Sequence, residues 1–353
     1  MPWSKIKYDI GEPDQFSQCR QEHRILSYVE AVREGLFQAL SADPNVFVMG
    51  QDVDAPGGMF GITRGLHAEF GGERVFDTPL AENALTGVAV GAAIAGMRPV
   101  YLHNRPDFLL LAMDQLVNHA AKWSYMFGGA VNVPLVIWTC IGRGWGSAAQ
   151  HSQALQGLFM HVPGLKLIMP STCYDAKGLL LAAIADPNPV LIMEHRLNFR
   201  QKGKVPPEIY QVPIGKGVVR RNGRDVTVVA TSHQVLEVFN IAQELTEEGI
   251  EVEIIDPMTL RPLDKDIILN SVAKTGRLVI VDTGWKTAGV GAEIGAMVAE
   301  EAFPYLKAPL KRVATPDLPT PAGFTLEQAF YTTAEDIKEA ICAVVDYHPR
   351  VAR

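Results

Sequence analysis

The sequence is poor in cysteine, in basic charge and in long apolar runs, and each shortage excludes a class of protein. Its four cysteines, Cys19, Cys140, Cys173 and Cys342, lie far apart and form no CxxC pair, which disfavours a disulfide framework or a zinc site. The formal net charge of −7 leaves no basic face for nucleic acid. No apolar run approaches the ~18 residues that span a bilayer, and the first residues lack the apolar core of a signal peptide. We therefore expect a cytoplasmic protein with no nucleic-acid or membrane partner.

Strand-like and helix-like segments alternate along most of the chain. Because a domain usually holds about 100–200 residues, a chain of 353 residues is expected to form two domains. Short β-branched runs between helical patterns predict an α/β fold, with doubly wound, mostly parallel sheets. A stretch rich in Lys, Pro and Gly separates the two series. The predicted division is an N-terminal extension (1–24), a first domain (25–200), a linker (201–217) and a second domain (218–353).

Two helix predictions rest on local patterns alone. Apolar residues recur at helical spacing from Ile25 to Leu40, and the pair Asp43-Pro44 ends that pattern. Asp107 is expected to cap a long helix that continues to about Met126.

The stretch Val75–Met97 is the centre of the sequence-based argument. A β-branched and aromatic run ends near Asp77 and Thr78, and a segment made almost wholly of Gly, Ala, Val and Leu follows Glu82. Asp77 or Thr78 is expected to cap a helix whose small residues let it lie close to neighbouring backbone. A carboxylate at the start of so apolar a helix is expected to have a raised proton affinity. The plain alternative is that Glu82 only complements the helix dipole.

His151 follows a glycine-rich strand end, where parallel sheets place their ligand crevice. An imidazole in such a crevice can transfer protons near neutral pH, and a histidine that only bonds a loop carbonyl is the structural alternative. His103, Asn104 and Arg105 occupy another strand end and are placed to face the same crevice. For Arg105, an ordinary surface or ion-pair role is the alternative. The residues alone leave these alternatives open.

Gly289, Gly291 and Gly295 follow a strand and open a helix, as the glycines of a dinucleotide-binding fingerprint do. Their GxGxxxG spacing and the irregular stretch 284–288 favour tight turning and helix packing instead. The chain has no Walker loop, HExxH or GxSxG motif, and Ser147 lacks an acidic partner and a nucleophile elbow. These absences disfavour a hydrolase.

Six short motifs occur in order along the chain. They are Phe76–Glu82, Asp114–Gln115 with Ala120–Lys122, Gln150–Gln153, Pro163–Lys166, Asp175–Gly178 and, beyond the linker, Ile255–Asp264. The first five resemble the β subunit of thiamine-diphosphate-dependent 2-oxoacid dehydrogenases, a family that includes the pyruvate, branched-chain and acetoin dehydrogenases. The last resembles the signature of the transketolase C-terminal domain. The resemblance implies a pyrimidine-binding first domain and a second domain of transketolase C-terminal type.

The resemblance also implies roles for individual residues. Glu82 would hydrogen-bond the aminopyrimidine ring of the cofactor and favour its imino tautomer, which suits a carboxyl group of raised proton affinity. Leu80 would pack beside that ring and Phe108 against its face. His151 would lie near the reacting carbon and move protons, while the cofactor acts as the electron sink.

The chain lacks the GDG motif with which such enzymes hold magnesium and diphosphate. It therefore resembles half of a site, and the resemblance implies that an α subunit supplies the magnesium and diphosphate half within an α2β2 heterotetramer. The resemblance also implies a potassium ion on backbone carbonyls, either on the segment before the strand that starts near Val136 or at the turn near Asp186, where a plain turn explains the sequence equally well. The expected potassium residues are Val133, Leu135, Val136, Ala183, Asp186 and Asn188.

The stretch before the predicted long helix departs from the family pattern. Related dehydrogenases carry an apolar and acidic sequence such as QFADF there, whereas this chain has His103, Asn104 and Arg105. These polar and cationic groups suggest an anionic or sugar-like substrate in place of pyruvate or a branched-chain acid.

We therefore expect the β subunit of an enzyme that decarboxylates a 2-oxoacid and passes the acyl group to the lipoyl arm of an acyltransferase. One alternative is a two-subunit transketolase-like or acyloin-forming enzyme that hands the carbon unit to an aldehyde or sugar. Another is a non-catalytic scaffolding subunit, which the presence of Glu82, Phe108 and His151 disfavours.

Overall fold

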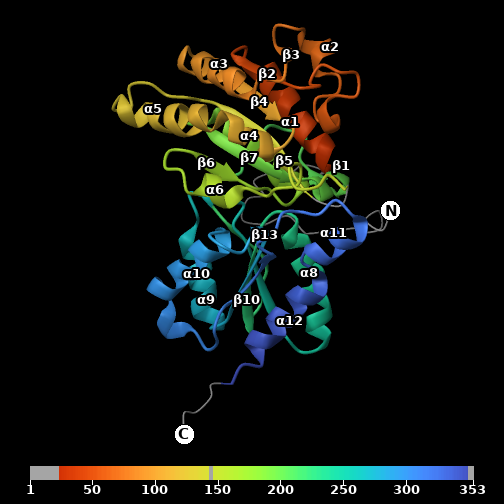
Figure 1. Cartoon of the computed structure of the whole chain (residues 1–353), viewed down its shortest axis with the longest axis vertical. Coiled ribbons are helices and arrows are strands. Elements are labelled where there is room, and N and C mark those ends of the chain that lie inside the picture. The colour runs from red at the N-terminus through yellow and green to blue at the C-terminus, as the bar shows by residue number, and fades with distance from the viewer. Residues whose placement is uncertain (1–23, 143–145, 349–353) are drawn as a thin grey trace.

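Two large helix-covered sheets, one above the other, form the body of the molecule, and a two-stranded sheet accompanies them (Figure 1). The computed structural model describes residues 24–142 and 146–348. The α/β fold with mostly parallel sheets, predicted from the alternation of strands and helices, is confirmed. The N-terminal extension proposed for residues 1–24 lies outside the described residues, apart from Arg24.

The upper unit in Figure 1 is built on a sheet of order β12-β6-β7-β5-β4-β2-β3, in which every neighbouring pair is parallel except β12 with β6. The central strands are buried along their whole length, so apolar residues fill both faces of the sheet. The elements are β1 (Arg24–Ser27), α1 (Tyr28–Ala42), β2 (Val46–Gly50), η2 (Met59–Gly61), α2 (Leu66–Phe70), β3 (Val75–Asp77), α3 (Glu82–Ile94), β4 (Arg98–His103), α4 (Pro106–Leu109), η3 (Leu110–Ala112), η4 (Asp114–Ala120), α5 (Ala121–Met126), β5 (Val136–Ile141), α6 (Gln156–Met160), β6 (Lys166–Ile168), α7 (Cys173–Ala185), β7 (Val190–His195), η5 (Arg196–Arg200) and β8 (Lys202–Val205).

The lower unit has a sheet of order β14-β13-β10-β11-β9, in which only the edge strand β9 runs antiparallel to its neighbour. Helices cover both faces of this sheet (Figure 1). The elements are β9 (Val218–Arg221), β10 (Val226–Ala230), α8 (Gln234–Glu247), β11 (Val252–Asp256), β12 (Thr259–Arg261), α9 (Lys265–Thr275), β13 (Leu278–Trp285), α10 (Val290–Glu301), η6 (Phe303–Tyr305), β14 (Lys311–Thr315), α11 (Phe324–Phe330) and α12 (Ala334–Val345).

The two units are joined through their sheets and through a buried ion cluster. Strand β12 belongs to the lower unit in sequence, but it pairs with β6 and so extends the upper sheet. Arg220 of β9 donates to Asp256 Oδ2 at 3.0 and 2.8 Å, and it also donates to Asp175 of α7. All three side chains are buried, so the guanidinium balances one carboxylate from each unit.

The start of the upper unit differs from the helix predicted over 25–40. Arg24–Ser27 forms β1, which pairs with β8, a strand inside the segment 201–217 predicted as a linker. The helix begins only at Tyr28, because Ser27 caps it in a reciprocal capping box with Glu30. The strand at the start of the predicted helix depends on one long-range strand pairing, which periodicity does not reveal.

The long helix predicted from Asp107 to Met126 is a chain of short helical segments. Pro106 occupies the first position of α4, and the helix then tightens into η3, widens into the π-helical η4 and ends as α5. Asp107 does not cap this helix, because it lies inside α4 and points at Gln153. Helix α4, which carries Phe108, contacts both β4 and β5.

Helix α3 starts at Glu82, as predicted, but neither Asp77 nor Thr78 caps it. Its N-cap residue is Ala81, which provides no side-chain hydrogen bond, and Asp77 Oδ1 accepts from the Asp52 amide instead. The first backbone amides of α3, at the positive end of the helix dipole, therefore have no side-chain cap and can donate to another group.

The three glycines of the GxGxxxG stretch have packing roles. A Cβ atom on Gly289 would lie 2.2 Å from the Trp285 carbonyl oxygen, and Cβ atoms on Gly291 and Gly295 would contact Ile280 and Leu310. The glycines let α10 lie close against its own sheet. This supports the packing interpretation over the dinucleotide fingerprint.

Candidate active site

Polar side chains gather where neighbouring strands of the upper sheet end. Glu82 opens the helix after β3, Arg105 follows β4, His151 follows β5 and Arg196 follows β7. Because these strands run parallel in one sheet, their carboxyl ends lie along one edge, where α/β proteins bind their ligands.

Glu82 lies half-buried in the first turn of α3. Burial, and then the charge of Glu82, raise the pKa of Tyr101 to about 12, which shows that the carboxylate lies near this buried phenol of β4. One turn further along α3, Thr86 Oγ1 lies 3.5 Å from His103 Nε2. The start of α3 therefore faces the end of β4.

His103 is buried and uncharged. Burial lowers its pKa to about 3, so the imidazole is neutral at physiological pH. Its ring centroid lies 4.1 Å from that of Tyr101. The cationic character expected at this strand end therefore comes from Arg105, and His103 contributes only a neutral hydrogen-bonding group toward Thr86.

Phe108 and His151 come together at the edge of the sheet. Their ring centroids lie 5.1 Å apart in an edge-to-face arrangement. Hydrogen bonds between the flanking residues fix this contact. The Gln153 backbone and side-chain amides donate to Asp107 Oδ1 at 3.2 and 2.8 Å. Phe108 is half-buried and His151 is exposed, so the imidazole can reach a molecule that approaches from solvent.

Asn104 and Arg105 lie beyond the end of β4. Asn104 donates to Gln51 Oε1 at 3.1 Å and so ties β4 to the end of β2. Arg105 is only 7% exposed. A surface role for Arg105, the alternative left open by the sequence, is therefore wrong.

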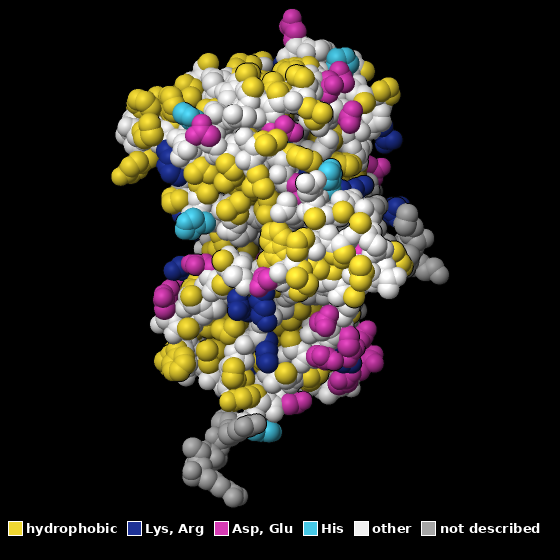
Figure 2. All heavy atoms as spheres, viewed as in Figure 1, with side chains coloured by type: hydrophobic (Ala, Val, Ile, Leu, Met, Phe, Trp, Pro, Cys, Tyr) yellow, Lys and Arg dark blue, Asp and Glu magenta, His cyan; other side chains and the backbone are white. Residues whose placement is uncertain are grey.

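Leu80 is 78% exposed, so in the isolated chain it packs on little. Other large apolar side chains are exposed on the neighbouring elements α3, η3 and α5, and Figure 2 shows hydrophobic side chains over this part of the upper unit. Exposed apolar patches of this kind mark surfaces that bind another protein. The residues are Leu80, Val88, Leu110, Leu111, Tyr125, Met126 and Phe127.

The two segments expected to hold potassium lie side by side. The Val190 amide donates to the Leu135 carbonyl at 2.9 Å, and Val136 pairs with Val190 in the sheet. At the turn after α7, which contains Asp186 and Asn188, two cationic side chains make contacts. Arg98 Nη1 donates to the Ile184 carbonyl at 2.8 Å, and Lys166 pairs with the Asp186 carboxylate. The remaining predicted residues lie on the same segments. The Leu135 amide donates to the Val133 carbonyl, and the Asp186 amide donates to the Ala183 carbonyl. The Asn188 amide donates to Asp186 Oδ1.

Within residues 24–142 and 146–348, no cluster of three or more His, Cys, Asp or Glu side chains is arranged to hold a metal ion. Over the same described ranges, no helix has the length and apolar character needed to cross a membrane.

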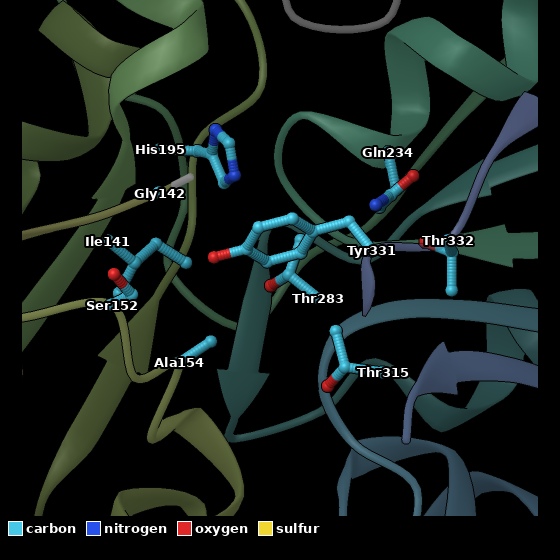
Figure 3. Close-up of a pocket in the computed structure, with 10 residues that line it drawn as sticks. All are labelled: Ile141, Gly142, Ser152, Ala154, His195, Gln234, Thr283, Thr315, Tyr331 and Thr332. Carbon is cyan, nitrogen blue, oxygen red and sulfur yellow. The ribbon is translucent and has the colours of Figure 1, made fainter. Parts of the chain in front are cut away.

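A small cavity lies between the two units (Figure 3). Its volume is about 20 Å³, which is enough for a single water and far too small for a cofactor. The ring of Tyr331, from the lower unit, reaches toward His195 and Ile141 of the upper unit. Ile141 and His195 are the last residues of β5 and β7, so the cavity lies at the junction of the two units, at the same end of the upper sheet as the candidate site.

Several contacts of this site escape sequence reasoning. Asp107 and Gln153 are 46 positions apart, and Tyr101 and Thr86 read as ordinary core residues. Among these residues, only Gln153 could be linked to the site from sequence, because it belongs to the motif Gln150–Gln153 that resembles the dehydrogenase β subunits.

The fold and the site together define a class. Residues 25–202 match the family model of the transketolase pyrimidine binding domain, and residues 215–337 match that of the transketolase C-terminal domain. The chain belongs to the family of β subunits of thiamine-diphosphate-dependent 2-oxoacid dehydrogenases, which are heteromeric enzymes that work with an α subunit.

Curated relatives are similar along nearly the whole chain. The acetoin:2,6-dichlorophenolindophenol oxidoreductase subunit beta of Bacillus subtilis is 42% identical over 326 residues, which cover 89% of this chain and 95% of the relative. The pyruvate dehydrogenase E1 component subunit beta of Rhizobium meliloti is 42% identical over 89% of this chain and 69% of its own length. The 2-oxoisovalerate dehydrogenase subunit beta of Bacillus subtilis is 39% identical over 92% of this chain and 99% of its own length.

Among solved structures, the chain is similar to an inactive beta4 tetramer of a split gene transketolase. The TM-score is 0.70 at 21% identity, with 91% of this chain and 98% of the other covered. This similarity concerns the fold alone.

Proposed function

We propose that this chain supplies the pyrimidine-binding half of a thiamine diphosphate site in a heteromeric enzyme that decarboxylates a 2-oxoacid. The observation that carries the proposal is the convergence, at one edge of the upper sheet, of Glu82 with Phe108 and His151. Family membership supports the cofactor and the reaction class.

The residues present fit the pyrimidine half of the cofactor. Glu82 would bind the ring nitrogen, since its carboxylate lies at the start of α3, where no side chain caps the helix. Leu80 and Phe108 would contact the faces of the ring, because one is exposed and the other half-buried at the same edge. When bound, thiamine diphosphate supplies the nucleophilic carbon and the electron sink for decarboxylation.

Two side chains are proposed to manage protons. Glu82 would hold a proton at the ring nitrogen of the pyrimidine. His151 would donate a proton to the carbonyl oxygen of the substrate or accept one from it, because imidazole is the side chain suited to proton transfer near neutral pH. The bond between Asp107 and Gln153 keeps the His151 loop beside Phe108.

The α subunit is proposed to complete the site and to cover the exposed apolar surface on α3, η3 and α5. An α2β2 heterotetramer would bury Leu80 and exclude water from Glu82. Magnesium and the diphosphate group are proposed to bind to the α subunit, as the sequence indicates by its missing GDG motif.

Potassium is proposed near the turn that contains Asp186 and Asn188. The segments that carry the candidate carbonyls are neighbours in the sheet, which supports the proposal. However, Arg98 and Lys166 already place two cationic groups on this turn, so no step of the reaction is assigned to potassium. The melting temperature of the α/β complex, measured with potassium and with sodium, tests whether the ion binds.

The central experiment compares Glu82→Gln with Glu69→Gln in a complex co-expressed with the α subunit. Glu69 is exposed on α2 and serves as the matched control. We expect Glu82→Gln to lower kcat by at least about 100-fold, in the range that general acid–base groups contribute, without preventing assembly. Unchanged turnover, or a wild-type complex that binds no thiamine diphosphate by isothermal titration calorimetry, contradicts the proposal.

The acyl acceptor is proposed to be the lipoyl arm of an acyltransferase. A purified lipoyl domain should be acylated by the complex in the presence of a 2-oxoacid, as measured by mass spectrometry. Reduction of 2,6-dichlorophenolindophenol without acylation of the lipoyl domain would instead favour the transketolase-like or acyloin-forming alternative.

A further inference from the structure

Arg105 is a buried cation that forms no ion pair with the described residues. Its side chain is only 7% exposed, and its Nη1 atom has no hydrogen-bond partner in residues 24–142 and 146–348. No described carboxylate forms an ion pair with it, and Asp107, two positions away, is bonded to Gln153. A guanidinium taken out of water in this way costs free energy until an anion reaches it.

A second guanidinium lies close by. In the sheet, β4 is the neighbour of β5 and β5 is the neighbour of β7, so Arg105 and Arg196 follow strands on either side of Cys140. Burial lowers the pKa of Arg196, and the positive charge of Arg105 lowers it further. Two cations that repel each other at the end of one sheet form a binding place for an anion.

Two acidic groups near Arg105 have raised pKa values. Burial raises the pKa of Glu194, which pairs with Cys140 in the sheet, to about 8, so this carboxyl is largely protonated at pH 7. Burial also raises the pKa of Asp107, against the opposing effects of its Gln153 donors and of Arg105. Neither carboxyl group forms an ion pair with Arg105, so Arg105 remains able to bind an anion.

We propose that Arg105, with Arg196 beside it, binds a second carboxylate of the substrate, so that the enzyme prefers 2-oxoacids whose chain ends in a carboxylate. The inference rests on the proposed function, because Arg105 lies three positions before Phe108 in the candidate site. It narrows the anionic or sugar-like substrate class suggested by the sequence to the dicarboxylic 2-oxoacids.

The chemistry is consistent with this assignment. Decarboxylation breaks the bond between C1 and C2 of the substrate and releases C1 as carbon dioxide, while the terminal carboxylate stays on the acyl group. A guanidinium offers paired N–H donors that match the two oxygens of a carboxylate. An apolar acyl chain would leave Arg105 buried without a partner, so it would bind less well.

The test uses the complex of this chain with its α subunit, loaded with thiamine diphosphate. Matched pairs of substrates isolate the terminal carboxylate: 2-oxoglutarate against 2-oxopentanoate, and 2-oxoadipate against 2-oxohexanoate. Turnover is followed by reduction of 2,6-dichlorophenolindophenol, and binding is measured by isothermal titration calorimetry. We expect kcat/KM to favour at least one dicarboxylic acid over its partner by about 10- to 100-fold, as a hydrogen-bonded charge pair provides.

Variants identify the residue responsible. Arg105→Gln should remove the preference mainly by raising KM for the dicarboxylic acid, and Arg105→Lys should keep part of it. Arg196→Gln should shift the preference in the same direction. Arg200→Gln is the matched control, because Arg200 lies on the same short helix as Arg196 but is exposed. Thiamine diphosphate affinity is measured for every variant.

Three results would overturn the inference. One is a wild-type complex that binds thiamine diphosphate but neither binds nor turns over a dicarboxylic acid better than its partner. Another is an Arg105→Gln variant that loses activity equally with both members of a pair. The third is an Arg105→Gln complex that dissociates without substrate, as measured by analytical ultracentrifugation, because the α subunit would then supply the counter-charge. Loss of thiamine diphosphate binding in the wild type contradicts the proposed function instead.

Discussion

The side-chain amide of Gln153 donates a hydrogen bond of 2.8 Å to Asp107 Oδ1, and this bond joins two segments of the candidate site. Asp107 precedes Phe108 on α4, and Gln153 follows His151 on the loop after β5. The second bond, from the Gln153 backbone amide, fixes the loop as well as the side chain. Asp107 is therefore a positioning residue for the contact between Phe108 and His151.

Substitution of Asp107 tests this role. Asp107→Ala removes both acceptor contacts, and we expect kcat to fall by about tenfold, because misplaced reacting groups lose part of the advantage of orientation. Asp107→Asn keeps an acceptor at Oδ1 and should retain most of the activity. If the alanine and asparagine variants lose activity equally, the hydrogen bonds are not the cause. Steady-state kinetics of the α/β complex, with melting temperature as a folding control, separates these outcomes.

Glu194 makes stability depend on pH. Its pKa is about 8 in the folded chain because of burial, and about 4.3 in an unfolded chain. The folded state therefore holds a proton that the unfolded state releases. The contribution of Glu194 to the free energy of unfolding is fully present below about pH 4.3 and is lost as pH rises toward 8. Glu194→Gln keeps the neutral form at all pH values. We expect its stability relative to wild type to increase by about 1 kcal/mol per pH unit across this window.

The measurement for Glu194 is the urea midpoint of wild type and variant at pH 5.5 and pH 8. Glu335→Gln is a suitable control, since Glu335 is exposed in the first turn of α12. A difference between wild type and Glu194→Gln that stays constant with pH would contradict the prediction.

Arg220 is expected to be the most costly residue to remove from the junction between the units. Arg220→Met leaves the buried carboxylates of Asp175 and Asp256 without their cation, which typically destabilises a fold by about 3–5 kcal/mol. The control is Arg224→Met, because the Arg224–Glu251 pair is exposed and such pairs contribute only about 0–1 kcal/mol. Urea unfolding followed by circular dichroism compares the two. Equal losses would show that the buried cluster has no special role.

Gly91 tests the surface proposed for the α subunit. A Cβ atom on this exposed residue of α3 would meet no atom within 4 Å, so Gly91→Leu should leave the isolated chain folded. Removing a glycine from a helix interior even favours the helix by about 0.5–1 kcal/mol. A closely packed α subunit would nevertheless clash with the leucine, and we expect complex formation to weaken by at least tenfold. Ala68→Leu on the exposed helix α2 is the control, and size-exclusion chromatography with both subunits gives the readout.

The start of α3 and the positions of the central strands could be predicted from sequence because both depend on local patterns. Glu82 opens the helix as expected, and the β-branched runs became the buried strands β2, β5 and β7. A ligand site at the carboxyl ends of the upper-sheet strands could also be predicted, because parallel strands place these ends at one edge of the sheet.

Other features depend on contacts between distant segments, and the sequence does not show them. Ile25 reads as the start of a helix until β1 is seen beside Lys204, 179 positions later (204 − 25). The burial of Arg105 and the neutral state of His103 likewise arise from the surrounding fold, because a charged side chain at a strand end is ordinarily exposed.

Strand β12 has a practical consequence for how this protein can be divided. A fragment that stops at residue 217 would contain every catalytic candidate but would lack Thr259–Arg261, leaving the backbone of β6 uncovered at a sheet edge. Uncovered edges recruit strands from other molecules, so such a fragment is expected to aggregate during expression. The catalytic half is thus inseparable from its neighbour as a recombinant product.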